Sequence, residues 1–406
     1  MKIKNAFAVT GITVCLLAMS GCGQQVEEAV IPEVETSGEA VIETTMEETT
    51  VTTVDESSTE YASSESVETE TLQDTKFDIT LAFAGDISFD DTSAVMQNYF
   101  AQGSVLSNVI DARYIEEMNQ ADLMWINNEF CYSLRGNPLP NKMYTFRANP
   151  EHVGMLQEMG VDVAGLANNH IYDFGKDAFL DTLDTLDGAG IPYVGAGHDL
   201  AEAMSPVYLE ADGVTIAYVA ASRAEKYKMT PQATEAEPGI LRCYDNTLFL
   251  KEIREADTKA DIVVALPHWG TEYSTKLEEA QTVGAKQYID AGADAVIGAH
   301  SHCIQGVELY NGKPIVYSLG NFWFNDKSLE TMLVKLHVSG EKDLGADLQS
   351  AEDDTIQVED IRLEILPGMQ SGCATVMADG AEKERILHYI ESISPAPIAL
   401  EYTSDK

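Results

Sequence analysis

A short apolar run passes directly into a histidine-containing loop in the sequence Ala295-Val296-Ile297-Gly298-Ala299-His300-Ser301-His302. A short apolar run bounded by glycine is typical of a buried strand. Two imidazoles, two residues apart in the loop that follows, suit the chelation of a metal ion. The stretch therefore predicts a strand over 295–297, with His300 and His302 as candidate metal ligands at its carboxyl end.

Four other apolar runs end in a similar way, each in a carboxylate, an amide or an imidazole. They cover 77–83 before Asp86, 123–126 before Glu129, 161–166 before Asn169-His170, and 262–266 before His268. The same patterns predict further strands over 191–194, 214–219 and 315–318, and helices over 176–186 and 277–291. Strands that alternate with helices indicate an α/β class, and no internal repeat is evident.

The polar ends of these runs are the main functional signal. In open α/β sheets, ligands bind outside the carboxyl ends of the strands, so side chains that are distant in sequence can meet there. Taken singly, each residue has an ordinary alternative, such as a turn, a cap or a buried imidazole. Taken together, they form an oxygen-and-imidazole set suited to a divalent Mn, Zn or Fe ion. The set is Asp86, Glu129, Asn169, His170, His268, His300 and His302.

The charge of the chain excludes some classes of partner. Its 406 residues include 67 Asp and Glu against 25 Lys and Arg, a formal net charge of −42. Binding to a nucleic-acid backbone requires clustered basic residues, so we expect no nucleic-acid partner. Six cysteines are too few for a disulfide scaffold.

The first 22 residues have the features of an export signal. Lys2 and Lys4 precede an apolar run over 6–19, which is shorter than the ~20 residues of a membrane-spanning helix. The run ends in Met19-Ser20-Gly21-Cys22, which resembles the lipobox of bacterial lipoproteins. We expect lipidation of Cys22 and a cell-membrane anchor on the extracellular face. The alternative is an ordinary signal peptide in which Cys22 has no special role.

Residues 23–76 read as an acidic, disordered tether between this signal and a domain over 77–400. Positions 24–75 contain 15 Asp and Glu and no Lys or Arg. Such a segment cannot bury enough apolar surface to offset its ordering entropy, and its charges repel one another.

The motifs also carry a family resemblance. The chain resembles the CapA-type capsule-synthesis family, linked to poly-γ-glutamate, within the calcineurin-like metallophosphoesterase superfamily. The resemblance runs from about residue 78 to 324 and more loosely to about 395. It rests on seven ordered blocks: Ala84-Gly85-Asp86, Asn127-Asn128-Glu129, Tyr144-Thr145-Phe146-Arg147-Ala148, Leu166-Ala167-Asn168-Asn169-His170, His268-Trp269-Gly270-Thr271-Glu272-Tyr273, Gly298-Ala299-His300-Ser301-His302 and Tyr317-Ser318-Leu319-Gly320-Asn321-Phe322.

The resemblance implies a four-layer α/β/β/α sandwich with a metal site at the sheet edges. It implies that Asp86 and His302 hold one ion, that Glu129 bridges, and that a second ion is held by Asn169, His268 and His300. His170 would be the catalytic acid or base beside them. Phosphoesterases have Asp-x-His at the first position, whereas this chain has Asp86-Ile87-Ser88. The first ion therefore lacks the imidazole that this motif would supply, and the number of ions stays at one or two.

Three functions fit these residues. The first is a surface-anchored, metal-dependent hydrolase or transferase in the synthesis of poly-γ-glutamate or a related capsule polymer. The alternatives are a general extracellular metallophosphoesterase and a non-catalytic component that binds or exports polymer. The expected partners are an anionic surface polymer or phosphorylated substrate, and membrane proteins of capsule synthesis. Arg147 is the predicted substrate-binding residue because a guanidinium can grip a carboxylate or phosphate through two bonds.

Overall fold

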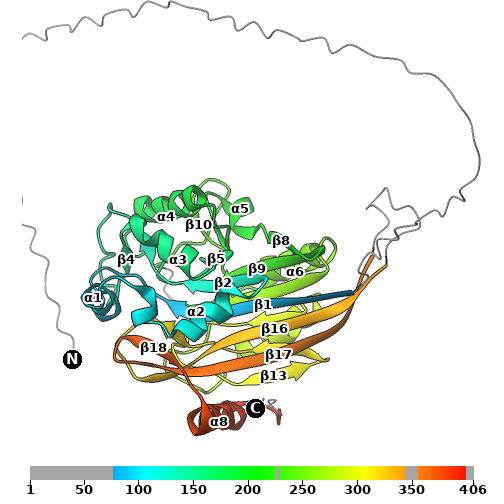
Figure 1. The fold of residues 1–406 in the computed structure, drawn as a ribbon. Coiled ribbons are helices and arrows are strands. Elements are labelled where there is room, and N and C mark those ends of the chain that lie inside the picture. The colour runs from blue at the N-terminus through cyan, green and yellow to red at the C-terminus, as the bar shows by residue number, and fades with distance from the viewer. Residues whose placement is uncertain (1–75, 225–228, 344–354, 399–406) are drawn as a thin grey trace, which may run out of the picture. The chain divides into compact units, whose positions relative to one another are not determined.

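The computed structural model describes residues 76–224, 229–343 and 355–398 (Figure 1). The predicted signal peptide with Cys22, and all of the predicted tether except Lys76, lie outside the described residues. Among the described helices, none has the length and apolar character that a transmembrane segment requires.

The larger sheet contains eight strands in the spatial order β18-β17-β16-β1-β2-β5-β6, and β15 also pairs with β1. Its central strands β1, β2 and β5 run parallel, whereas β16 pairs with β1 in the antiparallel direction. The strands are β1 (Lys76–Ile87), β2 (Leu123–Asn128), β5 (Val163–Gly165), β6 (Tyr193–Val194), β15 (Asn321–Trp323), β16 (Leu329–Asp343), β17 (Thr355–Ser371) and β18 (Ala374–Met377).

The second sheet contains six strands in the order β13-β14-β12-β11-β9-β8. They are β8 (Val207–Ala211), β9 (Val214–Ser222), β11 (Ile262–His268), β12 (Ala295–Ile297), β13 (Val307–Tyr310) and β14 (Lys313–Val316). Two small ribbons complete the strands: β3 (Cys131–Tyr132) with β4 (Arg147–Ala148), and β7 (Ala196–Gly197) with β10 (Gly239–Ile240).

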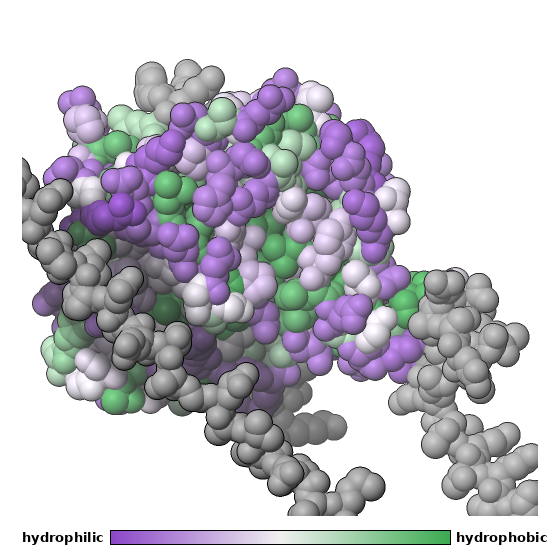
Figure 2. All heavy atoms as spheres, turned by 90° about the horizontal axis from the view of Figure 1, so that it is seen from above, coloured by the Kyte–Doolittle hydropathy of each residue, from purple (hydrophilic) through white to green (hydrophobic). Residues whose placement is uncertain are grey.

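Most of the helices pack on the outer faces of the two sheets, whereas the last helix contributes to the core between them. The α-helices are α1 (Ala94–Ala101), α2 (Ala112–Asn119), α3 (Gly154–Glu158), α4 (Lys176–Ala189), α5 (Leu200–Met204), α6 (Thr247–Asp257), α7 (Glu279–Asp290) and α8 (Gly380–Ile393). Two short 3₁₀ turns are η1 (Leu106–Asn108) and η2 (Pro150–Val153). Figure 2 shows the face seen from above in Figure 1, where hydrophilic side chains predominate and apolar ones are scattered between them.

Three apolar cores define the layers. Alternate residues of β1, such as Ile79 and Leu81, face a core shared with β9 and β11 of the second sheet. The residues between them, such as Ala82, face a second core formed with α1 to α4. A third core joins the outer face of the second sheet to α6 and α7. The predicted α/β/β/α arrangement is therefore confirmed.

The predicted elements are present, with small shifts at their ends. The helix predicted over 176–186 continues as α4 to Ala189, and its apolar positions Phe179, Leu183 and Leu186 are all buried. The helix predicted over 277–291 is α7, which starts at Glu279, and Gly292 follows with a positive φ of 121°. The long antiparallel pair β16–β17, which forms one side of the larger sheet, was not among the predicted strands.

Candidate metal centre

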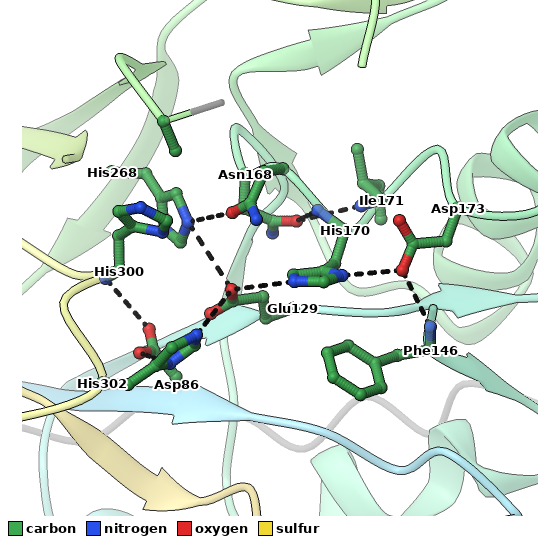
Figure 3. Close-up of polar contacts among 12 residues, drawn as sticks. Asp86, Glu129, Phe146, Asn168, His170, Ile171, Asp173, His268, His300 and His302 are labelled. Atoms are coloured by element: carbon green, nitrogen blue, oxygen red, sulfur yellow. Dashed lines mark hydrogen bonds and ion pairs between the residues drawn. The ribbon is translucent and has the colours of Figure 1, made fainter. Parts of the chain in front are cut away.

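The seven predicted site residues meet where the carboxyl ends of five strands converge, and Figure 3 labels all of them except Asn169. Asp86 lies near the end of β1, Glu129 directly follows β2, and His268 is the last residue of β11. The other four residues lie in the loops that follow β5 and β12. All seven are buried, with exposed fractions of 6% or less. The prediction that distant loops meet at one place is confirmed.

The close approach of neighbouring strands explains two glycines beside the centre. A methyl group on Gly85, next to Asp86, would lie 1.9 Å from the carbonyl oxygen of Gly320. A methyl group on Gly298, two residues before His300, would lie 2.1 Å from the carbonyl oxygen of Tyr317. A side chain at either position would push the strands apart and displace the polar residue that follows.

The carboxylate of Glu129 is the hub of the centre. Its Oε1 atom is buried and has no hydrogen-bond partner among the described residues. Three imidazole Nε2 atoms surround this oxygen, at 3.7 Å for His268, 3.8 Å for His302 and 3.9 Å for His170. These distances are too long for hydrogen bonds. They match the roughly 3–4 Å that separates two atoms bound about 2.0–2.2 Å from one cation.

Burial is the main influence on protonation in the centre. Burial, with the nearby charge of Asp86, raises the pKa of the Glu129 carboxyl well above its usual value. Burial lowers the pKa of His268 well below its usual value, and it lowers the pKa of His300 to about 3. Both imidazoles are therefore neutral near pH 7 and offer lone pairs to a cation.

One group of potential ligand atoms belongs to Glu129, His268 and His300, all within 4.8 Å of one another. The Nδ1 atom of His300 is buried and has no partner among the described residues. The Oδ1 atom of Asn169 lies 2.8 Å from Nε2 of His268, so the amide oxygen points into the same group. Unsatisfied buried polar atoms are costly, and a divalent cation would satisfy them.

A second group contains Asp86, Glu129 and His302, whose atoms also lie within 4.8 Å of one another. Nδ1 of His302 lies 3.0 Å from Oδ2 of Asp86 and 2.9 Å from Oδ1 of Asn321. These two acceptors favour the tautomer with hydrogen on Nδ1, which leaves the Nε2 lone pair directed at Glu129. The donor set of the two groups, imidazole nitrogens with carboxylate oxygens, fits Mn, Zn or Fe.

The loop that carries His300 and His302 has a constrained backbone. Their φ angles are 98° and 54°, in a region that residues with a Cβ seldom adopt. Such conformations cost about 1–3 kcal/mol each and persist where the surrounding structure enforces them. Here the His300 backbone N–H donates to Oδ1 of Asp86 at 3.3 Å, which ties the loop to β1.

His170 is positioned by a buried carboxylate. Its Nδ1 lies 2.7 Å from Oδ2 of Asp173, and its ring packs on Phe146 with centroids 4.4 Å apart. Burial lowers the pKa of His170 below its usual value, although the charge of Asp173 partly opposes this shift. With hydrogen on Nδ1 bonded to Asp173, Nε2 faces Glu129 and can accept or donate a proton.

A pocket with a volume of about 330 Å³ opens above the centre, with His170 and His302 in its wall. Its other walls include aromatic residues, among them Tyr144, Tyr273 and Phe324. Charged residues also line it: Glu272, Asp326 and Lys327. The ammonium of Lys327 lies 3.5 Å above the ring of Tyr273, a cation–π contact at the mouth.

Arg147, the predicted substrate-binding residue, is not among the residues that line this pocket. Its guanidinium donates to the carbonyl oxygens of Arg135 and Gly136 and lies over the ring of Phe174. Lys142 is the cation that reaches the centre: its Nζ pairs with Oδ1 of Asp173 at 2.7 Å and donates to the backbone oxygen of Asn169. The substrate role of Arg147 stays a prediction.

The structure adds residues that the motifs did not single out. Asp173 lies three positions after His170, a spacing at which a polar loop can fold back on itself, so a local signal existed. Tyr273 lies within the block that starts at His268, but its place over the pocket depends on the loop conformation. Lys327 lies beyond the last predicted block, and its position beside Tyr273 has no sequence signal.

Known proteins similar to this chain are linked to capsule synthesis. Residues 80–326 match the family model described as "Bacterial capsule synthesis protein PGA_cap". The "PGA biosynthesis protein CapA" of Bacillus subtilis (strain 168) is 36% identical over 202 residues, covering 49% of this chain and 52% of that protein. The "Capsule biosynthesis protein CapA" of Bacillus anthracis is 37% identical over 198 residues, covering 47% of each. The chain spans about half the length of these curated relatives.

Solved structures show looser similarity. A structure described as a novel phosphatase from Mycoplasma pneumoniae is 12% identical and aligns over 76% of this chain and 97% of that chain, with a TM-score of 0.42. A putative 5'-nucleotidase from Staphylococcus aureus is 15% identical over 78% of this chain and 58% of that chain, with a TM-score of 0.39. We draw no conclusion about activity from these alignments. The family model matches more than half of the residues of this chain, which shows that the chain belongs to the bacterial capsule synthesis protein family.

Proposed function

We propose that the protein is a metal-dependent hydrolase or transferase that acts on poly-γ-glutamate or a related capsule polymer. The observation that carries the proposal is the buried Oε1 atom of Glu129, which has no hydrogen-bond partner among the described residues and faces three imidazole Nε2 atoms. A catalytic divalent ion explains why such an arrangement is retained, because an uncompensated buried carboxylate is costly. The family's link to capsule polymer supports the substrate class.

One or two ions would be held by residues of the two groups: Asp86, Glu129, Asn169, His268, His300 and His302. The chemistry that Mn, Zn or Fe supplies in such a place is polarisation of an acyl or phosphoryl oxygen and a lower pKa for water. His170 supplies the proton transfer. In amide hydrolysis a water oxygen bonds to the acyl carbon, the C–N bond breaks, and Nε2 of His170 passes the proton of the water to the leaving nitrogen. In a transfer reaction an amine replaces the water.

The substrate would bind in the pocket above the centre. Its aromatic walls limit the access of bulk water, and Lys327 offers a positive charge to a carboxylate of the substrate. Glu272 and Asp326 lie in the same wall and oppose a dense polyanion. We therefore propose that one chain end or one residue of the polymer enters the pocket, rather than a long charged segment.

A screen of the purified protein tests this function. Poly-γ-glutamate and an aryl phosphate are each incubated with the protein, with and without EDTA, and new amine ends or released phenol are measured. We expect new amine ends that disappear with EDTA and return on addition of Mn²⁺. Turnover of the aryl phosphate alone would favour the general phosphoesterase. No turnover, together with polymer output that survives His170→Ala in cells, would favour a non-catalytic component.

We also propose a lipid anchor at Cys22, which would place the domain on the extracellular face of the membrane, near membrane proteins of capsule synthesis. The support is the sequence Met19-Ser20-Gly21-Cys22 after an apolar run. Replacing Cys22 by Ala is expected to move the protein from the membrane fraction to the medium. Unchanged fractionation would contradict the anchor.

A further inference from the structure

The side-chain amide of Asn127 lies between two buried carboxylates. Its Nδ2 donates to Oδ1 of Asp86 at 2.8 Å and to Oε2 of Glu129 at 2.9 Å. Both amide hydrogens are therefore used, one for each carboxylate. Asn127 itself is 3% exposed, so solvent offers little competition for these bonds. The two carboxylates share a donor where a cation could otherwise join them.

The neighbouring Asn168 fixes the orientation of this amide. Nδ2 of Asn168 lies 3.3 Å from Oδ1 of Asn127 and 2.8 Å from the backbone oxygen of Asn128. Its Oδ1 accepts from the backbone N–H groups of His170 and Ile171. Asn168 therefore presents a donor to Asn127. If the side-chain amide of Asn127 were rotated by 180°, its NH₂ group would face the NH₂ group of Asn168, and its oxygen would face the two carboxylates. Both contacts are repulsive.

The two sides of the centre differ in how many atoms already have partners. On the Asp86 side, Oδ1 accepts from Asn127 and from the His300 backbone, and Oδ2 accepts from His302. Ser88 stands where an imidazole would be needed, and its hydroxyl accepts from the Asp90 backbone at 3.4 Å.

The opposite side holds two potential ligand atoms that lack partners. Oε1 of Glu129 and Nδ1 of His300 are buried, and neither has a hydrogen-bond partner among the described residues. A cation beside these residues would supply the missing partner for these buried atoms. A cation between Asp86 and Glu129 has to displace hydrogen bonds that are already made, and would leave the buried N–H groups of Asn127 unsatisfied.

We propose that the centre binds a single divalent ion, on the side of Glu129, His268 and His300, and that the amide of Asn127 takes the place of a second cation. The inference rests on the proposed function, because it assumes that the centre binds metal. It assigns Asn127 a defined role: it neutralises the repulsion between Asp86 and Glu129 by hydrogen bonds, without a second ion.

Manganese titration of the full-length protein tests the stoichiometry. The protein is stripped with EDTA, dialysed, and loaded with MnCl₂, and bound metal is measured by elemental analysis and by electron paramagnetic resonance. We expect one Mn²⁺ per chain with the six-line spectrum of an isolated ion. Two ions per chain with a spin-coupled spectrum would overturn the single-ion inference and leave the proposed function intact. No bound metal would overturn both.

Two matched variants test the role of Asn127. Replacing Asn127 by Asp removes both hydrogens and adds a carboxylate, so we expect the stoichiometry to rise from one to two with a coupled spectrum. The control is Asn128→Asp, because the Asn128 amide donates to the Phe130 carbonyl instead, and we expect it to stay at one. A folded Asn127→Asp protein that still binds one ion would overturn the role of Asn127. The wild-type stoichiometry stands as a test even if that variant does not fold.

Discussion

The candidate metal centre, which we call the floor of the pocket, and the mouth of the pocket above it are built in different ways. The centre consists of polar side chains that are at most 6% exposed and lie at strand ends or in the loops that follow them, where hydrogen bonds hold them. At the mouth, Tyr144 is 63% exposed and Tyr273 is 43% exposed, and both lie on loops. A rigid floor suits bond-making chemistry, whereas exposed loops can vary with the substrate. Under the proposed function, the floor would determine the reaction and the mouth would determine which substrate enters.

The largest effect is expected from the floor. Replacing His300 by Ala removes a ligand atom that has no other partner among the described residues, and we expect metal affinity to fall by more than about 100-fold. Equilibrium dialysis with Mn²⁺ or Zn²⁺ measures this directly. The matched control is His388→Ala on α8, where the imidazole is largely exposed, and it should bind metal normally. Equal losses in both variants would contradict a localised centre.

Replacing His170 by Ala separates proton transfer from metal binding. Because Asp173 and Phe146 position the imidazole, we expect kcat to fall about 100- to 10,000-fold while metal content stays normal. Asp173→Asn should give a smaller fall, since the imidazole remains but loses its orienting charge. Full activity of the His170→Ala protein would show that His170 does not transfer the proton.

Glu129→Gln is expected to change stability in a way that depends on pH. Burial raises the pKa of Glu129, so without metal the folded state opposes its ionisation and loses stability as pH rises. In EDTA the variant should therefore melt a few degrees above the wild type at pH 8, and the difference should shrink at acid pH, where the carboxyl is protonated in both states. Metal should raise the melting temperature of the wild type alone. If the variant is less stable than the wild type at pH 8 in EDTA, then ionisation of the buried Glu129 carboxyl does not destabilise the folded state, and the account is contradicted.

The mouth should show smaller effects. Lys327→Met removes the positive charge above Tyr273, and we expect KM to rise about three- to tenfold with kcat little changed. The same measurement on Arg147→Met sharpens the comparison, because that guanidinium lies outside the pocket lining and binds backbone carbonyls. A larger rise in KM for Arg147→Met would shift the substrate site away from the pocket and support the role predicted from sequence.

The fold and the floor could be predicted because their signals are local. A buried strand shows itself as a short apolar run, and the residue after it shows what stands at the sheet edge, as at Ile297 and His300. The pair β16–β17 escaped prediction because β17 is half-exposed along much of its length. Its alternation of apolar and polar residues is also interrupted at Glu359 and Asp360, where the pairing with β16 shifts in register.

The mouth and the supporting contacts could not be predicted because they join remote segments. Lys327 meets Tyr273 across 54 positions, and Lys142 meets Asp173 across 31. Nothing in the spacing of these residues records the contact, which depends on how two loops pack. Asn127 shows the same limit at closer range: the motif gives its position, but only the geometry shows that it binds two carboxylates.

The most direct test of a cation at Glu129 is an anomalous difference map from a crystal grown with MnCl₂. We predict a peak about 2.0–2.2 Å from Oε1 of Glu129, with His268 and His300 as its nearest imidazoles. A crystal with full occupancy of Mn²⁺ elsewhere, or with no peak beside Glu129, would contradict the account.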